Sequence, residues 1–174
     1  MDDIRRGTTM HIDLPDHCVV LMAGASGAGK STLARGIART AVPETVIESY
    51  DRWRQLLTGD PHEQSATPGA VGAVHTILDA ACLSGRLSMV VDGTHSTPTE
   101  RAAVLDIATR HQVPVVLVAV LTPLRVCLAR QDSRARPVPA DTVTRQFSNL
   151  MDGIATVHTE GFAAVHLTTG VGGR

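Results

Sequence analysis

The sequence predicts an α/β fold, a three-layer sandwich in which a parallel sheet of about five strands carries helices on both faces. Three observations support this prediction. Short apolar segments alternate with helical segments along the chain, the order that builds parallel sheets. The predicted strands are apolar almost throughout, as expected of strands that are buried on both faces. The first strand runs directly into a glycine-rich loop and then into a helix.

The five predicted strands are short runs rich in β-branched and other apolar residues, bounded by turn-forming residues. They cover residues 17–23, 45–48, 87–92, 113–121 and 162–167. In open parallel sheets, ligands bind beyond the carboxyl ends of the strands. The residues that follow these five runs are therefore the first candidates for a functional site.

Helical periodicity and capping residues predict six helices between the strands. They cover residues 30–40, 51–57, 69–85, a segment opened by the N-cap Thr97 and by Pro98, residues 123–131 and residues 140–151. The proline-containing segments 58–68 and 132–139 are predicted loops, and residues 171–174 a frayed tail. The whole chain, 1–174, is predicted to form one domain with its core at about 17–168 and short flexible ends.

Composition narrows the classes of function. The chain has 174 residues, a formal net charge of −1 and only 2% aromatic residues. This argues against a broad nucleic-acid footprint and against a row of stacking platforms for a long single strand. A bound nucleic acid is therefore expected at a small site, such as a strand end.

No apolar run approaches the length of a membrane span, and the first six residues lack a signal-peptide core. Cys18, Cys82 and Cys127 lie far apart in apolar segments, so we expect reduced thiols in the core. Together these features predict a cytoplasmic protein with no membrane segment.

The glycine-rich loop reads G-A-S-G-A-G-K-S over residues 24–31, which is the P-loop pattern and predicts a P-loop NTPase fold. Lys30 is the only lysine in the chain, and its ammonium would reach the outer phosphates of ATP or GTP. The hydroxyl of Ser31 would ligate Mg²⁺. The residues expected to hold the nucleotide are Gly24, Ala25, Ser26, Gly27, Ala28, Gly29, Lys30, Ser31 and Thr32.

The second strand is followed by Asp51 and, three residues later, by Arg54. If a helix begins there, the two side chains share a face. The carboxylate of Asp51 would then accept the proton of an attacking hydroxyl, while the guanidinium of Arg54 holds a phosphate of the same acceptor. The alternative is that Asp51 only caps the helix and Arg54 is a solvated surface charge.

The third strand ends in Asp92-Gly93-Thr94-His95, the form of a Walker-B strand. Its aspartate is expected to bind Mg²⁺ or to fix the P-loop serine. The alternative is a plain strand-end turn of the Asp-Gly type. His95 is a candidate substrate contact, although a single loop histidine is often incidental.

Three arginines, Arg130, Arg134 and Arg136, precede two prolines that break the following segment. Arginines in a closing lid can neutralise the charge that builds up during phosphoryl transfer. The spacing of four predicts that Arg130 and Arg134 share one helical face. The alternative is a solvated basic patch.

In this order, these motifs resemble the kinase domain of the polynucleotide 5′-hydroxyl kinases of phage and bacterial end-healing repair. The resemblance runs from about residue 19 to residue 167. It implies ATP and Mg²⁺ as cofactors, Asp51 as general base and Arg54 as the acceptor's phosphate ligand. It places Arg130 and Arg134 in the lid. Asp92, Thr94 and His95 would lie at the acceptor, with histidine where the family usually carries asparagine.

Three functions follow as hypotheses. The motif order favours an ATP-dependent kinase that phosphorylates the 5′-hydroxyl end of RNA or DNA. The low aromatic content and slight negative charge favour a small-molecule kinase for a sugar, nucleoside or antibiotic, although Arg54 would serve no purpose with a neutral acceptor. The third is a nucleotide-dependent switch, which has no need of a general base such as Asp51.

Overall fold

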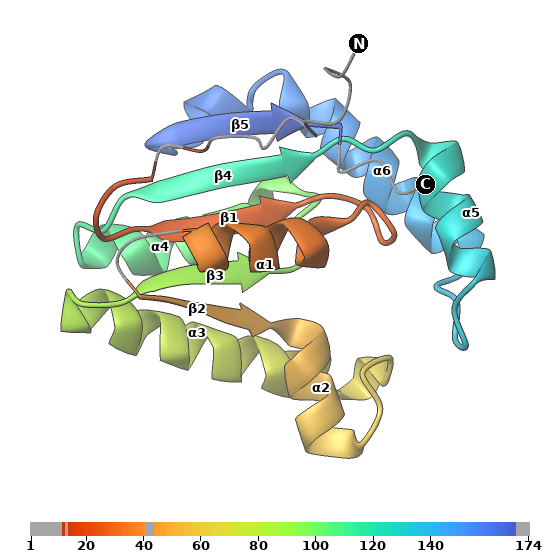
Figure 1. Ribbon diagram of the computed structural model, residues 1–174, viewed down its shortest axis with the longest axis horizontal. Helices are drawn as coiled ribbons and strands as arrows, with labels where there is room; N and C mark the ends of the chain where they lie inside the picture. The colour runs from red at the N-terminus through yellow and green to blue at the C-terminus, as the bar shows by residue number, and fades with distance from the viewer. Residues whose placement is uncertain (1–11, 13, 41–43, 170–174) are drawn as a thin grey trace, which may run out of the picture.

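The computed structural model describes residues 12, 14–40 and 44–169, and there it confirms the α/β prediction (Figure 1). Five parallel strands form one sheet in the order β2-β3-β1-β4-β5. Their bounds are β1 Val19–Ala23, β2 Thr45–Ser49, β3 Ser88–Asp92, β4 Val115–Val120 and β5 Ala164–Thr168. Each lies within two residues of a predicted strand. The predicted tail at 171–174 lies outside the described residues.

The central strand β1 is buried on both faces of the sheet, which explains its unbroken apolar sequence. Its side chains alternate between two hydrophobic clusters. Val19, Leu21 and Ala23 pack in one cluster, whereas Val20 and Met22 pack in the other. The three layers predicted from the sequence correspond to these two cores with the sheet between them.

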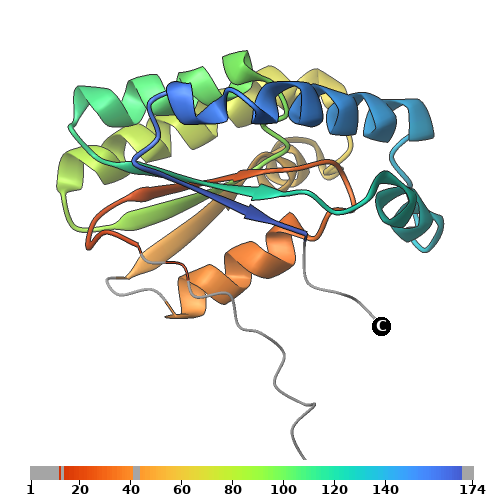
Figure 2. The ribbon, with the colours of Figure 1, turned by 90° about the horizontal axis from the view of Figure 1, so that it is seen from above.

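The helices cover the two faces unequally (Figure 2). Helix α1 (Lys30–Thr40) lies on one face, and α3 (Thr67–Ser84), α4 (Pro98–Arg110) and α6 (Ala140–Ile154) lie on the other. Helices α2 (Tyr50–Thr58) and α5 (Leu124–Asp132) lie beyond the carboxyl ends of the strands (Figure 1). These two short helices therefore border the edge where a ligand is expected.

Local sequence signals account for several helix ends. Thr97 caps α4 in a capping box with Glu100, with Pro98 at the first helical position, as predicted. Ser49 caps α2 by accepting a hydrogen bond from the backbone N–H of Arg52 at 3.2 Å. Gly59 ends α2 with φ of 77°, a conformation that favours glycine.

The segment predicted as a loop over residues 58–68 is more ordered than expected. It holds a short 3₁₀ helix, Gln64–Ala66, and α3 begins at Thr67, two residues before the predicted start. The reason is Pro68, which fits the first turn of a helix and does not mark loop there. The free, buried state expected for Cys18, Cys82 and Cys127 is confirmed. Within the described residues, no helix has the length and apolarity needed to cross a membrane.

Candidate active site

The loop between β1 and α1 has the backbone conformation of a phosphate-binding loop. Gly24, Gly27 and Gly29 have φ angles of 151°, 88° and 101°, where L-residues are strained. A Cβ on Gly27 would lie 2.6 Å from the carbonyl oxygen of Cys127 in α5. The loop is therefore pressed against the following helix, and only glycine fits at its apex.

Lys30 and Asp92 face each other at the base of this loop. Burial lowers the pKa of Lys30 below its ordinary value, while the charges of Asp92 and Asp51 act in the opposite direction. Burial raises the pKa of Asp92, opposed by a hydrogen bond from Ser31 and by the charge of Lys30. Lys30 also donates to the carbonyl oxygen of Ala25 at 3.0 Å.

The side chains of Ser31 and Asp92 have the chemistry that a Mg²⁺ site requires. A hydroxyl and a carboxylate in hydrogen-bonding contact are two hard oxygen ligands, which suits an ion that takes its remaining ligands from phosphates and water. Among the described residues, no group of three histidine, cysteine or acidic side chains forms a separate metal site. The residues thus fit a magnesium ion that arrives with a nucleotide.

A cavity of about 730 Å³, here called the P-loop cavity, opens above these groups. It is lined by Ser26, Gly27, Gly29, Lys30, Ser31, Thr32, Arg35, Ser49, Tyr50, Asp51, Arg54, Asp92, Gly93, Thr94, Arg130, Ser133 and Arg134. Of the predicted nucleotide ligands, Gly24, Ala25 and Ala28 are buried and support the loop from behind. The others border the cavity.

The lid, here residues 130–139, approaches the P-loop directly. The guanidinium of Arg130 donates to the carbonyl oxygen of Gly27 at 2.9 Å. The prediction that Arg130 and Arg134 share a helical face is wrong, because α5 ends at Asp132 and Arg134 lies in the following turn. Both arginines nevertheless line the P-loop cavity.

Asp51 lies in the first turn of α2, at the edge of the P-loop cavity. The N-cap of this helix is Ser49. The alternative that Asp51 only caps the helix is therefore wrong. Its side chain is 70% exposed and forms an ion pair with Arg54, whose side chain is only 12% exposed. Arg54 also donates from Nε to the carbonyl oxygen of Pro61 at 2.7 Å.

A second cavity of about 810 Å³, here called the side cavity, adjoins the first. Six residues line both cavities: Ser26, Tyr50, Asp51, Arg54, Thr94 and Arg134. Asp51 and Arg54 therefore stand at the junction of two spaces, one built on the P-loop and one built from α3, α4, α6 and the lid.

The side cavity carries an excess of positive charge. Four arginines line it, namely Arg54, Arg134, Arg136 and Arg145, against the two carboxylates of Asp51 and Glu100. Four residues of this wall were not predicted from the sequence: Arg145, Glu100, His62 and His75. They come from different elements, and no local spacing links them.

His95 is held within the protein and is only 3% exposed. Its Nδ1 lies 2.7 Å from the carbonyl oxygen of Met22, which only accepts, so Nδ1 carries the proton. Nε2 then accepts from the hydroxyl of Tyr50 at 3.0 Å. Burial lowers the pKa of His95 to about 4 and raises that of Tyr50 to about 12. His95 reaches the wall of the side cavity with both ring nitrogens already bonded.

The loop that carries Thr94 and His95 is fixed from two sides. The backbone N–H of Gly24 donates to the carbonyl oxygen of Thr94 at 2.8 Å, which ties this loop to the P-loop. Arg101, fully buried, donates to the carbonyl oxygen of His95 at 3.0 Å. It also forms a two-pronged pair with Glu160 at 2.7 and 2.5 Å. The role of Arg101 was not predicted from the sequence, because its partner lies 59 residues away.

A family model described as an AAA domain matches residues 19–156. No curated protein sequence matches this chain. Among solved structures, a chain of the Pnkp1/Rnl/Hen1 RNA repair complex is 20% identical with a TM-score of 0.71. That alignment covers 85% of this chain and 47% of the other, so the present chain spans about half of that relative's length.

Two further structures are similar in fold. A gluconokinase from Sinorhizobium meliloti 1021 is 19% identical with a TM-score of 0.59, over 91% of this chain and 85% of that chain. The tunicamycin resistance protein of Deinococcus radiodurans is 18% identical with a TM-score of 0.55, over 86% of each chain. Because the family model covers most of the sequence and the P-loop geometry accompanies it, the chain belongs to the AAA_33 family of AAA domains.

Proposed function

We propose that this protein is an ATP-dependent kinase that phosphorylates the 5′-hydroxyl end of an RNA or DNA strand. The observation that carries the proposal is the junction of two cavities at Asp51, Arg54 and Arg134. The P-loop cavity suits the phosphates of the donor, and the side cavity suits an acceptor. A phosphoryl group passing between the two would cross this junction.

In the proposed reaction, the acceptor's hydroxyl oxygen bonds to the γ-phosphorus and the bond from that phosphorus to the β,γ-bridging oxygen breaks. ADP leaves, and the carboxylate of Asp51 takes the hydroxyl proton. Lys30, Arg130 and Arg134 stabilise negative charge on the transferring group. Mg²⁺ held by Ser31 and Asp92 would supply further neutralisation of the phosphates.

The charge and size of the side cavity support an anionic acceptor. Four guanidinium groups against two carboxylates favour phosphate or carboxylate groups over a neutral molecule. A volume of about 810 Å³ suits one ligand of modest size. A strand end meets both conditions, and the fold similarity to a chain of an RNA repair complex is in keeping with it.

A second candidate is a kinase for a small anionic hydroxyl compound, such as a sugar acid. One observation favours it: Arg54 already spends two of its donors on Asp51 and on the Pro61 carbonyl oxygen. Its capacity for an acceptor phosphate is thereby reduced. The fold similarity to a gluconokinase agrees with this reading. A nucleotide switch is the weakest candidate, because it has no use for Asp51 at the junction.

The test is transfer of label from γ-labelled ATP to a panel of acceptors. The panel includes a 5′-hydroxyl oligonucleotide, the same oligonucleotide with a 5′-phosphate, nucleosides, sugars and gluconate. We expect label only on the 5′-hydroxyl strand. Labelling of a small molecule alone would support the second candidate, and no transfer with retained ATP binding would support the switch.

A further inference from the structure

We propose that Arg136 binds a second phosphate of the acceptor strand at the mouth of the side cavity, and that Asp60 holds its guanidinium ready until the strand enters. This inference rests on the proposed function, because it concerns the acceptor of that same site. It assigns a role to Arg136, which lines only the side cavity and has no role in the proposed reaction.

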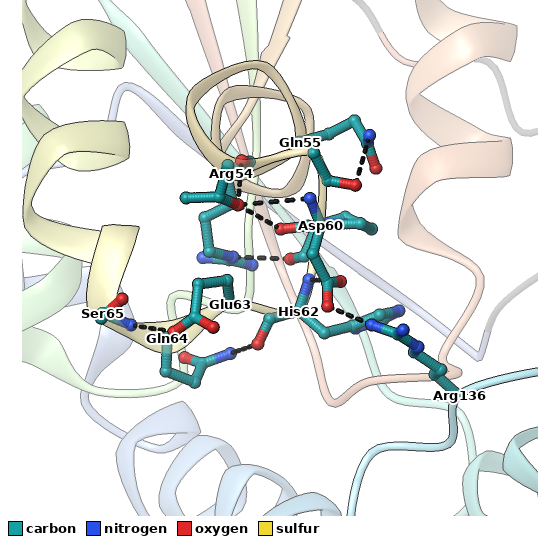
Figure 3. Close-up of polar contacts among 11 residues, drawn as sticks. Arg54, Gln55, Asp60, His62, Glu63, Gln64, Ser65 and Arg136 are labelled. Carbon is teal, nitrogen blue, oxygen red and sulfur yellow. Dashed lines mark hydrogen bonds and ion pairs between the residues drawn. The ribbon is translucent and has the colours of Figure 1, made fainter.

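Arg136 and Asp60 join two segments that are 76 residues apart in sequence. Figure 3 shows the Arg136 side chain reaching from the lid to Asp60, in the turn between α2 and α3. The other carboxylate oxygen of Asp60 accepts from the backbone N–H of His62 at 2.9 Å. Asp60 is thus fixed by its own turn, and this bond together with the charge of Arg136 keeps its pKa below the ordinary value.

The lid side of this contact is also anchored. Two residues beyond Arg136, the backbone N–H of Val138 donates to Oε1 of Gln131 at 3.2 Å, and the Gln131 side chain is buried against α5. Pro137 lies between them and restricts the backbone. The guanidinium of Arg136 is therefore presented from a constrained segment at the wall of the side cavity.

Two of the four arginines that line the side cavity lie at different depths, and each of these two is paired with a carboxylate. Arg54 is 12% exposed and pairs with Asp51 at the junction. Arg136 is 68% exposed and pairs with Asp60 at the rim. A phosphate on Arg54 would neighbour the reacting hydroxyl, whereas a phosphate on Arg136 would have to belong to a later nucleotide.

Replacement of Asp60 by a phosphate as the partner of Arg136 should cost little free energy. Exposed ion pairs contribute little to stability, whereas arginine and phosphate form two parallel charge-assisted hydrogen bonds. Arg145 of α6 lines the same wall. Within the part of the chain that the structure describes, its side chain makes no hydrogen bond or ion pair, so it is free to share that phosphate.

If Arg136 binds a second phosphate, the protein should discriminate between acceptors by the number of phosphates that they carry. A nucleoside 3′-monophosphate carries one phosphate and would engage Arg54 alone. A dinucleotide with a 3′-phosphate carries two and would engage Arg136 as well. The gain in kcat/KM on going from the first acceptor to the second should therefore depend on Arg136.

The experiment compares the wild-type chain with Arg136→Gln, Asp60→Asn and the control Arg125→Gln. Arg125 is an exposed arginine of α5 that lines neither cavity. For Arg136→Gln we expect about a tenfold loss of kcat/KM with the dinucleotide, less than about twofold loss with the monophosphate, and an unchanged KM for ATP. Asp60→Asn should leave or improve the KM for the dinucleotide, because it releases Arg136.

An equal effect of Arg136→Gln on both acceptors, or no effect on either, would overturn the inference while leaving the proposed function intact. A loss with Asp60→Asn as large as that with Arg136→Gln would also overturn it, because Asp60 would then be more than an exchangeable partner. Failure of the wild-type chain to phosphorylate any nucleic-acid end would instead remove the proposed function, and this inference with it. The unchanged KM for ATP reports that each variant is folded.

Discussion

Protonation of His95 should destabilise the folded protein, and the structure gives the size of the effect. The imidazole donates to the Met22 carbonyl oxygen and accepts from Tyr50. A proton on Nε2 would remove the acceptor and place a charge in a site that is 3% exposed. The folded state therefore prefers neutral His95, which agrees with its lowered pKa of about 4.

The sign of the pH dependence follows from the two states. An unfolded histidine titrates at its ordinary value of 6.5, so between pH 6.5 and 4 the unfolded chain binds a proton that the folded chain refuses. The contribution of neutral His95 to the free energy of unfolding is present in full well above pH 6.5, and it decreases as the pH drops toward 4. The full shift corresponds to about 3 kcal/mol, of which about 2 kcal/mol is lost between pH 7 and pH 5.

Urea unfolding at pH 7 and pH 5 measures this loss in the wild-type chain, in His95→Asn and in the control His158→Asn. Asparagine tolerates the φ of 37° at position 95 but does not titrate. His158 is exposed. We expect the wild type and the control to lose about 2 kcal/mol more than His95→Asn, a midpoint difference on the order of 1 M urea. A loss of stability in His95→Asn as large as that in the control over the same pH interval would contradict the role of His95.

Three further changes test the site and its support. Asp51→Asn should lower kcat by about 10²- to 10⁴-fold while ATP affinity, measured by calorimetry, is retained; persistent turnover would contradict the role of Asp51 as base. Arg54→Ala should raise the KM for a 3′-phosphorylated acceptor far more than the KM for ATP, and equal increases would exclude an acceptor clamp. Arg101→Met should destabilise the fold by about 3–5 kcal/mol in urea unfolding, because Glu160 is left without its partner; a loss below about 1 kcal/mol would mean that the pair is not needed.

Local patterns in the sequence predicted the parts of the molecule that depend on neighbours in the chain. The P-loop glycines, the Thr97 cap and the apolar strands were all predicted correctly, because their signals lie within a few residues. The start of α3 was missed because Pro68 fits a first helical turn as well as it fits a loop. The shared helical face of Arg130 and Arg134 was wrong because α5 ends at Asp132.

Contacts between distant segments were beyond reach of a single sequence. Tyr50 and His95 are 45 residues apart, and Arg101 and Glu160 are 59 residues apart. Gly93 shows what a local sequence pattern leaves out. Read locally, it is a turn residue after Asp92, but a Cβ there would lie 2.6 Å from the Tyr50 ring and 2.7 Å from the His95 ring. The requirement for glycine at this position comes from the Tyr50 and His95 rings, which become its neighbours only in the folded chain.

The pairing of Asp51 with Arg54 bears on how the proposed kinase would avoid transferring phosphate from ATP to water. A carboxylate oxygen engaged by a guanidinium is less available to accept a proton from a nearby hydroxyl or water. An acceptor phosphate competes for Arg54, and its binding would release that oxygen beside the reacting hydroxyl. Water carries no phosphate and would leave the pair closed. Under the proposed function, Arg54 would therefore discriminate between acceptors by freeing the carboxylate of Asp51 as well as by binding the strand. Its position as the most buried of the four arginines that line the side cavity suits both roles.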